Sequence, residues 1–292
     1  MKLGVIGGSG VYDLEGLQDI RHEDISTPFG RPSDPIICGR LGGREICFVP
    51  RHGKGHRLLP SEINHRANIF ALKLLGVDRV VSISAVGSLK EECRPRDIVL
   101  PDQYVDRTKG SLAHTFFGNG IVAHVSFGEP TCPEMRRVIA STARMVVGSK
   151  KGQDTRVSDR GVYVNMEGPA FSTKAESHAY RHLGFDIIGM TSLPEAKLCR
   201  EAEMCYQSMA MVTDYDCWHE DTASVTVEMV ISHVKANTTL AKEILRQVVP
   251  ALPERHGCGC GSALQTAIMT DPKTVPPEIL KKMAPIVGKY IK

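Results

Sequence analysis

The sequence has no excess of charge of either sign and no apolar segment long enough to cross a bilayer. Of its 292 residues, 36 are basic and 33 are acidic, which leaves a net charge of +3, and the Lys and Arg residues are scattered. Nucleic-acid-binding proteins usually gather basic side chains on one face or in runs, so nucleic acid is not an expected partner. A membrane-spanning helix needs about 18 or more consecutive apolar residues. No window approaches that length, so we expect no membrane association.

Signs of secretion are also missing. The apolar run after Met1 is too short for the hydrophobic part of a signal peptide, and glycines follow it at once. Most of the nine cysteines stand singly in apolar segments, as Cys38 and Cys47 do. This placement indicates buried free thiols in a reducing compartment, so we expect a cytoplasmic protein.

Cys258 and Cys260 are the exception, because a single glycine separates them. Three interpretations stay open: a strained disulfide, a pair of simple thiols, or two ligands of a metal ion. The argument against the metal is that no second Cys or His pair lies at the spacing of a zinc site.

Short β-rich runs alternate with helical patterns along most of the chain, without internal repeats or low-complexity tracts. Strands are predicted at 3–7, 45–50, 79–85, 98–100, 162–164, 187–188 and 206–213, and helices from 60 to a stop at 76 and at 133–147, 174–183, 194–203 and 225–249. This alternation predicts a single α/β domain with a mixed central β-sheet flanked by helices. We expect residues 1–250 to form the main domain and residues 251–292 to form a helical extension packed on it.

The glycine-rich opening follows the first strand directly. The run Gly7-Gly8-Ser9-Gly10 does not have the G-x-G-x-x-G spacing of a dinucleotide fingerprint, and no clean helix follows it. A nicotinamide cofactor is therefore not expected. Glycines still allow backbone N–H groups to approach an anion, and the Ser9 hydroxyl adds a donor. Taken alone, the segment is better explained as a tight turn after a strand.

Two further strand ends carry groups suited to an anion. Arg51 and His52 follow one strand, between Pro50 and Gly53, and Ser84 and Ala85 end a strongly hydrophobic one. Arg offers a planar fork of donors to phosphate oxygens, and small residues leave backbone amides accessible. The carboxyl ends of strands are where open α/β sheets bind ligands, so these residues predict an oxyanion site.

Two later segments suit an aromatic base. Ser172 and Thr173 precede a predicted helix with the pattern of a capping box, which leaves Phe171 able to stack on a planar ring. Asp214 and Asp216 follow an apolar run at a spacing that a strand would place on one side. An Asp-x-Asp pair also binds metal in other proteins, but we locate no further ligands for magnesium. At the edge of an apolar pocket, the two acids would suit N7 and the exocyclic amine of a purine.

Together these motifs resemble one enzyme family. The segments are Ser9 with its glycines, 27–34, 51–53, 167–169 and 213–218. They are similar to the 5′-methylthioadenosine phosphorylases of the trimeric purine nucleoside phosphorylase class, over about Gly4 to Val249. The resemblance implies an α/β catalytic domain, a homotrimer or a dimer of trimers, and phosphorolysis of methylthioadenosine to adenine and 5-methylthioribose 1-phosphate. Inorganic phosphate is then a co-substrate, and neither a metal nor an organic cofactor is implied.

The resemblance also implies roles for individual residues. The phosphate would be held by Ser9, Arg51, His52, Ser84 and the backbone N–H of Ala85. The nucleoside would be bound by Phe171, Ser172, Met190, Thr191, Asp214, Asp216, Val227, Val230, Ile231 and, from a neighbouring subunit, His124. Within this set, the apolar slot for the methylthio group would be formed by Val227, Val230 and Ile231.

Substrate choice within the class depends on Ser172 and Asp214. Relatives that act on 6-oxopurines carry Glu and Asn at these places, whereas a carboxylate accepts a hydrogen bond from a 6-amino group and repels O6. Adenine is therefore favoured over hypoxanthine and guanine. Asp214, in a partly dry pocket beside Asp216, is expected to have a raised pKa and to protonate N7 of the leaving base. The alternatives are a 6-oxopurine or methylthioinosine phosphorylase, and a nucleoside-binding sensor without catalysis.

Overall fold

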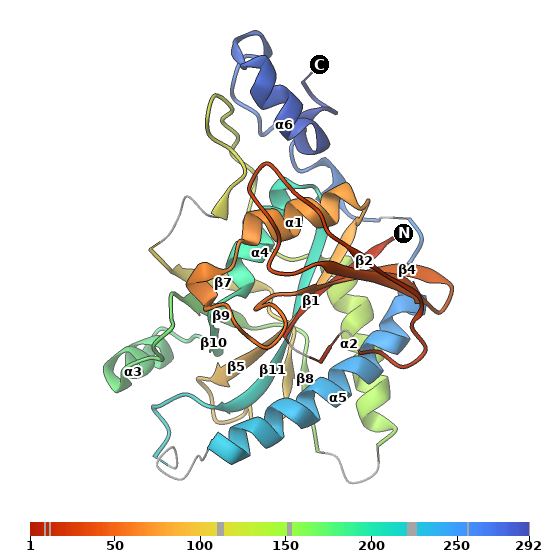
Figure 1. The fold of residues 1–292 in the computed structure, drawn as a ribbon. Coiled ribbons are helices and arrows are strands. Elements are labelled where there is room, and N and C mark those ends of the chain that lie inside the picture. Colours follow the sequence, from red (N-terminus) through yellow and green to blue (C-terminus); the bar gives the residue numbers. More distant parts are fainter. Residues whose placement is uncertain are drawn as a thin grey trace.

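The computed structural model describes the chain except Ser9, Tyr12, 110–113, 151–153, 221–226, His256 and Lys292, and leaves out the side chains of 227–230. Among the described residues, one mixed sheet runs in the order β2-β3-β4-β1-β5-β10-β9-β7, with β11, β6 and β8 branching from β5 (Figure 1). The strands are β1 (Leu3–Gly7), β2 (Gln18–Glu23), β3 (Ile36–Leu41), β4 (Arg44–Pro50), β5 (Arg79–Ser88), β6 (Ile98–Val99), β7 (Gln103–Arg107), β8 (Val157–Ser158), β9 (Val162–Met166), β10 (Ile187–Gly189) and β11 (Cys205–Tyr215). The pairs β1–β4, β1–β5 and β5–β11 are parallel, so the carboxyl ends of these four strands meet at one edge.

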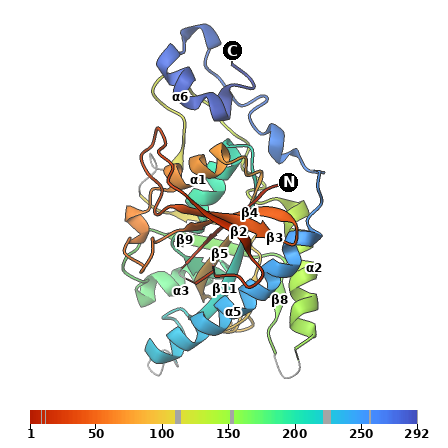
Figure 2. The same ribbon diagram turned by 45° about the vertical axis from the view of Figure 1, so that its right-hand side comes forward.

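Helices cover both faces of this sheet, which confirms the predicted α/β fold with a mixed, helix-flanked sheet. They are α1 (His65–Leu74), α2 (Pro133–Gly148), α3 (Lys174–His182), α4 (Ser192–Glu201), α5 (Val227–Ala251) and α6 (Pro277–Val287). The buried faces of α2 and α5 pack with one side of the sheet, and those of α1 and α4 pack with the other. Figure 2 shows the same two layers from a second direction.

Most predicted elements are confirmed within a few residues, with instructive exceptions. The helix predicted to open at Pro60 begins as a 3₁₀ turn, η1 (Pro60–Glu62), and α1 starts only at His65. The start is set by Asn64, whose side chain accepts a hydrogen bond from the Ala67 backbone N–H. The short or exposed strands β2, β7 and β8 were not predicted, because they do not bury an alternating set of apolar residues.

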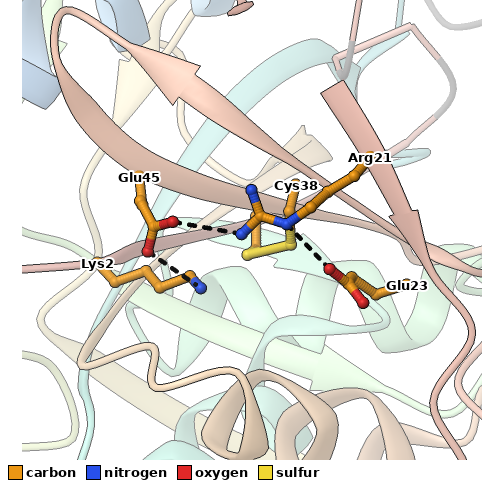
Figure 3. Close-up of a disulfide and its surroundings, with 6 residues drawn as sticks. Lys2, Arg21, Glu23, Cys38 and Glu45 are labelled. Atoms are coloured by element: carbon orange, nitrogen blue, oxygen red, sulfur yellow. Dashed lines mark hydrogen bonds and ion pairs between the residues drawn. A yellow bond between two sulfur atoms is a disulfide. The ribbon is translucent and has the colours of Figure 1, made fainter. Parts of the chain in front are cut away.

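The expectation of free thiols at Cys38 and Cys47 is wrong, because the structure joins them in a disulfide. They lie directly opposite each other in the antiparallel pair of β3 and β4, with Cα atoms 4.2 Å apart. Figure 3 shows this disulfide beside ion pairs that connect Arg21 and Lys2 to Glu45. The strand register, which single cysteines in a sequence do not reveal, brings the two sulfur atoms together.

The chain after α5 continues as a tail that packs on the α1 side of the molecule and ends in α6, beyond α1 in both views. Its buried apolar residues, among them Leu264, Val275 and Ile286, join the core of α1 and α4. Glu203 ties it further by accepting hydrogen bonds from the Leu264 backbone N–H and the Tyr290 hydroxyl. Among the described residues, no helix is long and apolar enough to span a membrane.

Candidate active site

Two adjoining cavities of about 290 and 280 Å³ open at the edge where the carboxyl ends of β4, β5 and β11 meet. Both are lined by Arg51 and His52 after β4, by Ser84 and Ala85 in β5, and by Thr213 in β11. The larger cavity extends from these residues to a pair of carboxylates at the end of β11. One end of the site is therefore rich in donors and the other is acidic.

Arg51 is the charged centre of the donor-rich end. It is 2% exposed, and its guanidinium donates through Nη2 to Ser82 Oγ at 2.6 Å and through Nη1 to the Ile83 carbonyl at 3.1 Å. It also forms a buried ion pair with Glu195 of α4, which receives a further hydrogen bond from the Tyr206 hydroxyl at 3.1 Å. Burial opposes the charge on Arg51, but the carboxylate of Glu195 outweighs it and raises the pKa of Arg51. The cation is thus fixed in place before any ligand binds.

His52 is neutral at this end of the site. Burial, with the nearby charge of Arg51, lowers the pKa of His52 to about 4. Its Nδ1 lies 2.9 Å from the Leu58 carbonyl, so a neutral ring must carry its proton there and leave Nε2 as an acceptor. The ring also stacks on His56, with centroids 4.2 Å apart. A neutral His52 can accept a hydrogen bond from a protonated phosphate oxygen but cannot attract the anion by charge.

A β-bulge points the acidic end of β11 at the cavity. Val212 pairs with Val86 of β5 and Asp214 pairs with the next residue, Gly87, so Thr213 is an extra residue in β11. The bulge is held by hydrogen bonds: Asn237 of α5 donates to the Val212 carbonyl at 2.8 Å. Both carboxylates of the pair line the cavity as a result.

The two carboxylates have different surroundings. Burial is the main cause that raises the pKa of Asp214, and the nearby Asp216 contributes in the same direction. The Thr213 hydroxyl donates to Asp214 Oδ2 at 2.6 Å, which opposes the shift only in part. Asp216 is 9% exposed, and its buried Oδ2 has no hydrogen-bond partner among the described residues. A buried acceptor of this kind is costly unless a ligand donates to it.

Two glycines allow the part of the cavity wall around Met190 and Thr191 to form. A Cβ at Gly189, the last residue of β10, would lie 1.9 Å from the Tyr163 hydroxyl. A Cβ at Gly168 would lie 2.6 Å from the Met190 sulfur, and this glycine has a φ of +73°. Both positions therefore require glycine. They bring Met190 and Thr191 against the cavity between its two ends.

Comparison with known proteins shows the family of this chain. A family model described as the phosphorylase superfamily matches residues 2–250. The chain belongs to the phosphorylase superfamily. It is 53% identical over 290 residues to the S-methyl-5′-thioadenosine phosphorylase of Koribacter versatilis, with 99% of this chain and 96% of that protein covered. Its identity to the enzyme of the same name from Geobacter sulfurreducens is 50% over 289 residues, covering 99% of each. A solved methylthioadenosine phosphorylase from an Antarctic soil metagenomic library superimposes with a TM-score of 0.92 at 43% identity, covering 98% of each chain.

Most residues predicted for the site of this superfamily member line the cavities. They are Arg51, His52, Ser84, Ala85, Phe171, Met190, Thr191, Asp214 and Asp216. Ser9 lies outside the described residues, as do the side chains of Val227 and Val230.

Three predicted residues do not line the cavities of their own chain. The Ser172 hydroxyl contacts the Met166 sulfur at 3.8 Å, and Met166 is the residue of the two that reaches the cavity. Ile231 is 61% exposed, and it is Val234, one helical turn further along α5, that lines the wall. His124 is exposed and lies with the tail, where its backbone N–H donates to the Ala267 carbonyl at 2.8 Å.

Some residues of the site were not predicted from the sequence: Glu195, which orients Arg51, and the cavity residues His56, Val234 and Asn237. Glu195 lies 144 positions from Arg51, so no local pattern relates the two. Among the described residues, no group of three metal-ligating side chains lies at the cavity.

Proposed function

We propose that the chain cleaves S-methyl-5′-thioadenosine with inorganic phosphate, giving adenine and 5-methylthioribose 1-phosphate, a step of purine and methionine salvage. The observation that carries the proposal is the joined cavity with an anchored arginine at one end and two partly dry carboxylates at the other. A nucleophilic anion and a leaving base need opposite surroundings, and these two ends offer them. The S-methyl-5′-thioadenosine phosphorylases at 53% and 50% identity support the choice of substrate.

At the donor-rich end, phosphate would bind through Arg51, Ser84 and the backbone N–H of Ala85, with the Ser9 hydroxyl as a further donor. His52, neutral at pH 7, would accept from a protonated phosphate oxygen. The phosphate needs no general base, because its oxygen is already anionic. It attacks C1′ of the ribose as the bond from C1′ to N9 of the base breaks, and its charge stabilises the cationic sugar.

At the acidic end, the leaving purine needs a proton at N7. The raised pKa of Asp214 suits it to carry that proton and to donate it as the bond to the sugar breaks. The buried Oδ2 of Asp216 is an acceptor without a partner among the described residues, and the 6-amino group of adenine would supply the missing donor. A 6-oxo group would place a second acceptor there, which is the physical reason for an aminopurine.

The rest of the nucleoside would contact apolar groups. Phe171 lines the cavity and yet is 83% exposed, so its ring can cover the base. Met190 would lie along the ribose with Thr191 beside it. The 5′ methylthio group would face α5, where Val227, Val230 and Ile231 were predicted and Val234 lines the wall. Ser172 would border the base from behind Met166.

We also propose that the active assembly is a homotrimer, alone or paired as a dimer of trimers, and that it works in the cytoplasm. His124 does not line the cavity of its own chain, which is compatible with its predicted action in a neighbouring subunit. The proposed reaction uses inorganic phosphate and needs neither a metal ion nor an organic cofactor. Small molecules and copies of this chain are the only partners proposed.

Product analysis tests the proposal. The protein is incubated with methylthioadenosine, methylthioinosine or adenosine, each with and without phosphate. Adenine should be released from methylthioadenosine only when phosphate is present, and adenosine should be a slower substrate. Hypoxanthine from methylthioinosine alone would overturn the assignment of Asp216 to an amino group. Thermal stabilisation by phosphate without any turnover would indicate a binding protein instead.

A further inference from the structure

Four cysteines that are far apart in the sequence meet at the amino end of β11, the end away from the cavity. Cys132 occupies the N-cap position of α2, and Cys205 begins β11. Cys258 directly precedes the 3₁₀ turn η4 (Gly259–Ser262) in the tail, and Cys260 lies within it. Their four Sγ atoms all lie within 4.8 Å of one another. Three of these residues are buried and Cys258 is partly buried. We refer to this group as the cysteine cluster.

The spacing of the sulfur atoms matches a tetrahedral zinc site. Four sulfur atoms about 2.3 Å from one zinc ion lie about 3.8 Å from each other. In the cysteine cluster, the Sγ atoms of Cys205 and Cys258 are 3.3 Å apart, and every pair is within 4.8 Å. The separation of about 3.8 Å that Zn²⁺ requires lies between these two values.

The same spacing does not favour disulfides. Four cysteines allow three disulfide connectivities. Here each sulfur atom has three sulfur neighbours within 4.8 Å, so more than one pairing lies within reach. Cys258 contacts Cys205 rather than forming a bond to Cys260, its neighbour in sequence. By contrast, the strand register of β3 and β4 gives Cys38 a single partner, Cys47.

The surroundings favour thiolates and admit an ion. Cys132 occupies the N-cap of the 16-residue helix α2, where the helix dipole stabilises negative charge. A surface pocket of about 460 Å³ is lined by Cys258 and Cys260 and also by Arg137 and Arg200. It provides a route from solvent to the cluster, and its lining also includes Glu129 and Glu134, which balance the charge of the two arginines.

We propose that the cysteine cluster binds one Zn²⁺ ion through four thiolates and acts as a structural site. All four ligands come from the protein, which leaves no open position for a substrate and is typical of structural zinc. Each thiol that is still protonated gives its proton to solvent when it binds the ion, and no electrons are transferred. β11 has 11 residues and separates the cluster from the carboxylates by about 30 Å, so the ion takes no part in phosphorolysis.

The site would join three separate parts of the chain. The loop before α2 and the start of β11 belong to the core, while η4 lies between α5 and the end of the tail. Because zinc binds the folded arrangement of ligands and not the unfolded chain, it stabilises the attachment of the tail. Removal of the ion should loosen residues after Ala251 first.

Metal analysis of the full chain tests the proposal. The protein is produced with zinc in the medium, purified under a phosphine reductant without chelator, and analysed by plasma mass spectrometry. We expect one zinc per chain, and an absorption spectrum of tetrahedral cobalt thiolate after exchange into Co²⁺. Cys258→Ser should lose its zinc to a chromophoric chelator at a concentration that leaves the parent protein loaded. Chelation should lower the melting temperature of the parent protein and leave that of Cys258→Ser unchanged.

Cys93→Ser is the matched control, because Cys93 is a partly buried thiol outside the cluster, and it should keep one zinc per chain. Cys258 is the most exposed member of the cluster, so its substitution spares the core; circular dichroism checks that the variant is folded. Iron in place of zinc, one zinc retained by Cys258→Ser, or no zinc binding by the reduced protein would each overturn the proposal. Disulfides among the four cysteines, mapped by mass spectrometry on the zinc-supplied, reductant-treated protein, would also overturn it.

Discussion

At the Arg51 end of the cavity the charged groups are paired, whereas at the Asp216 end a carboxylate oxygen has no partner among the described residues. Arg51 donates to Glu195, Ser82 and the Ile83 carbonyl before a ligand arrives. The Oδ2 atom of Asp216 has no hydrogen-bond donor among the described residues, and burial raises the pKa of the neighbouring Asp214. At the anion end, the hydrogen-bond partners of Arg51 therefore fix the position of its charge. At the base end, Asp214 can donate a proton, and Asp216 can accept a hydrogen bond from an amine.

The largest effect is expected from Glu195→Ala, which removes the support of the anion end. The change leaves the buried guanidinium of Arg51 without its carboxylate, and breaking a buried pair in this way costs about 3–5 kcal/mol. The free energy of unfolding, measured with urea, should fall by that amount. Glu15→Ala, which removes an exposed partner of Arg246, is the control and should behave like the parent protein. Equal stability of both variants would show that the pair does not organise this end.

Asp214→Asn should have the next largest effect and acts on the base end. An amide cannot give up a proton to N7, so we expect kcat/KM for methylthioadenosine to fall about 10²- to 10³-fold. Because the acid form of Asp214 is the active one, the rate of the parent enzyme should decline as pH rises through the raised pKa of this carboxyl. The variant should lose that decline.

The control for Asp214→Asn is Asp13→Asn, since the Asp13 carboxylate is 91% exposed and lies 3.8 Å from Lys242. Its kcat/KM should match that of the parent enzyme over the whole pH range. A variant at position 214 with near-normal turnover would remove Asp214 from the acid role, whatever the stability of the protein.

Asp216→Ala is expected to stabilise the protein and at the same time to weaken its binding of the substrate. Removal of a buried acceptor without a partner should raise the free energy of unfolding by about 1 kcal/mol, while the KM for methylthioadenosine rises. Asp216→Asn keeps a polar group in the same place and should not show the gain in stability. If Asp216→Ala is destabilising and leaves KM unchanged, the carboxylate has a structural partner and does not receive the amine.

The smallest effect is expected from His52→Gln at the anion end and concerns pH. The folded pKa of His52, about 4, lies below the usual 6.5, so the unfolded chain binds the proton more readily between these values. The stability that neutral His52 contributes is fully present above pH 6.5 and is lost as pH falls towards 4. Urea unfolding should therefore show a smaller loss between pH 7 and pH 4.5 for His52→Gln than for the parent protein. Identical losses would contradict the low pKa.

The elements and much of the cavity could be predicted, because both depend on short stretches of sequence. The apolar runs that form β1, β4, β5 and β11 predict strands, and the polar residues directly after or within their ends predict the cavity. Arg51 directly after β4, Ser84 within β5 and Asp214 within β11 were found in this way. Ile231 was predicted on the correct helix, α5, but Val234, one turn further along, lines the cavity. Helical periodicity indicates which face of a helix is apolar, and it does not indicate how deeply each residue is buried.

What the sequence by itself determined is the α/β fold, the strand ends that carry polar groups, and the motif of Asp214 and Asp216. Only the tertiary structure decided which distant side chains meet: Glu195 with Arg51, Cys38 with Cys47, and Cys132 and Cys205 with the cysteines of the tail. The physical reason is the distance along the chain over which each kind of interaction acts. Backbone geometry and hydrophobic periodicity act over a few residues, whereas a buried ion pair or a four-sulfur site depends on strand register and on how the helices and the tail pack.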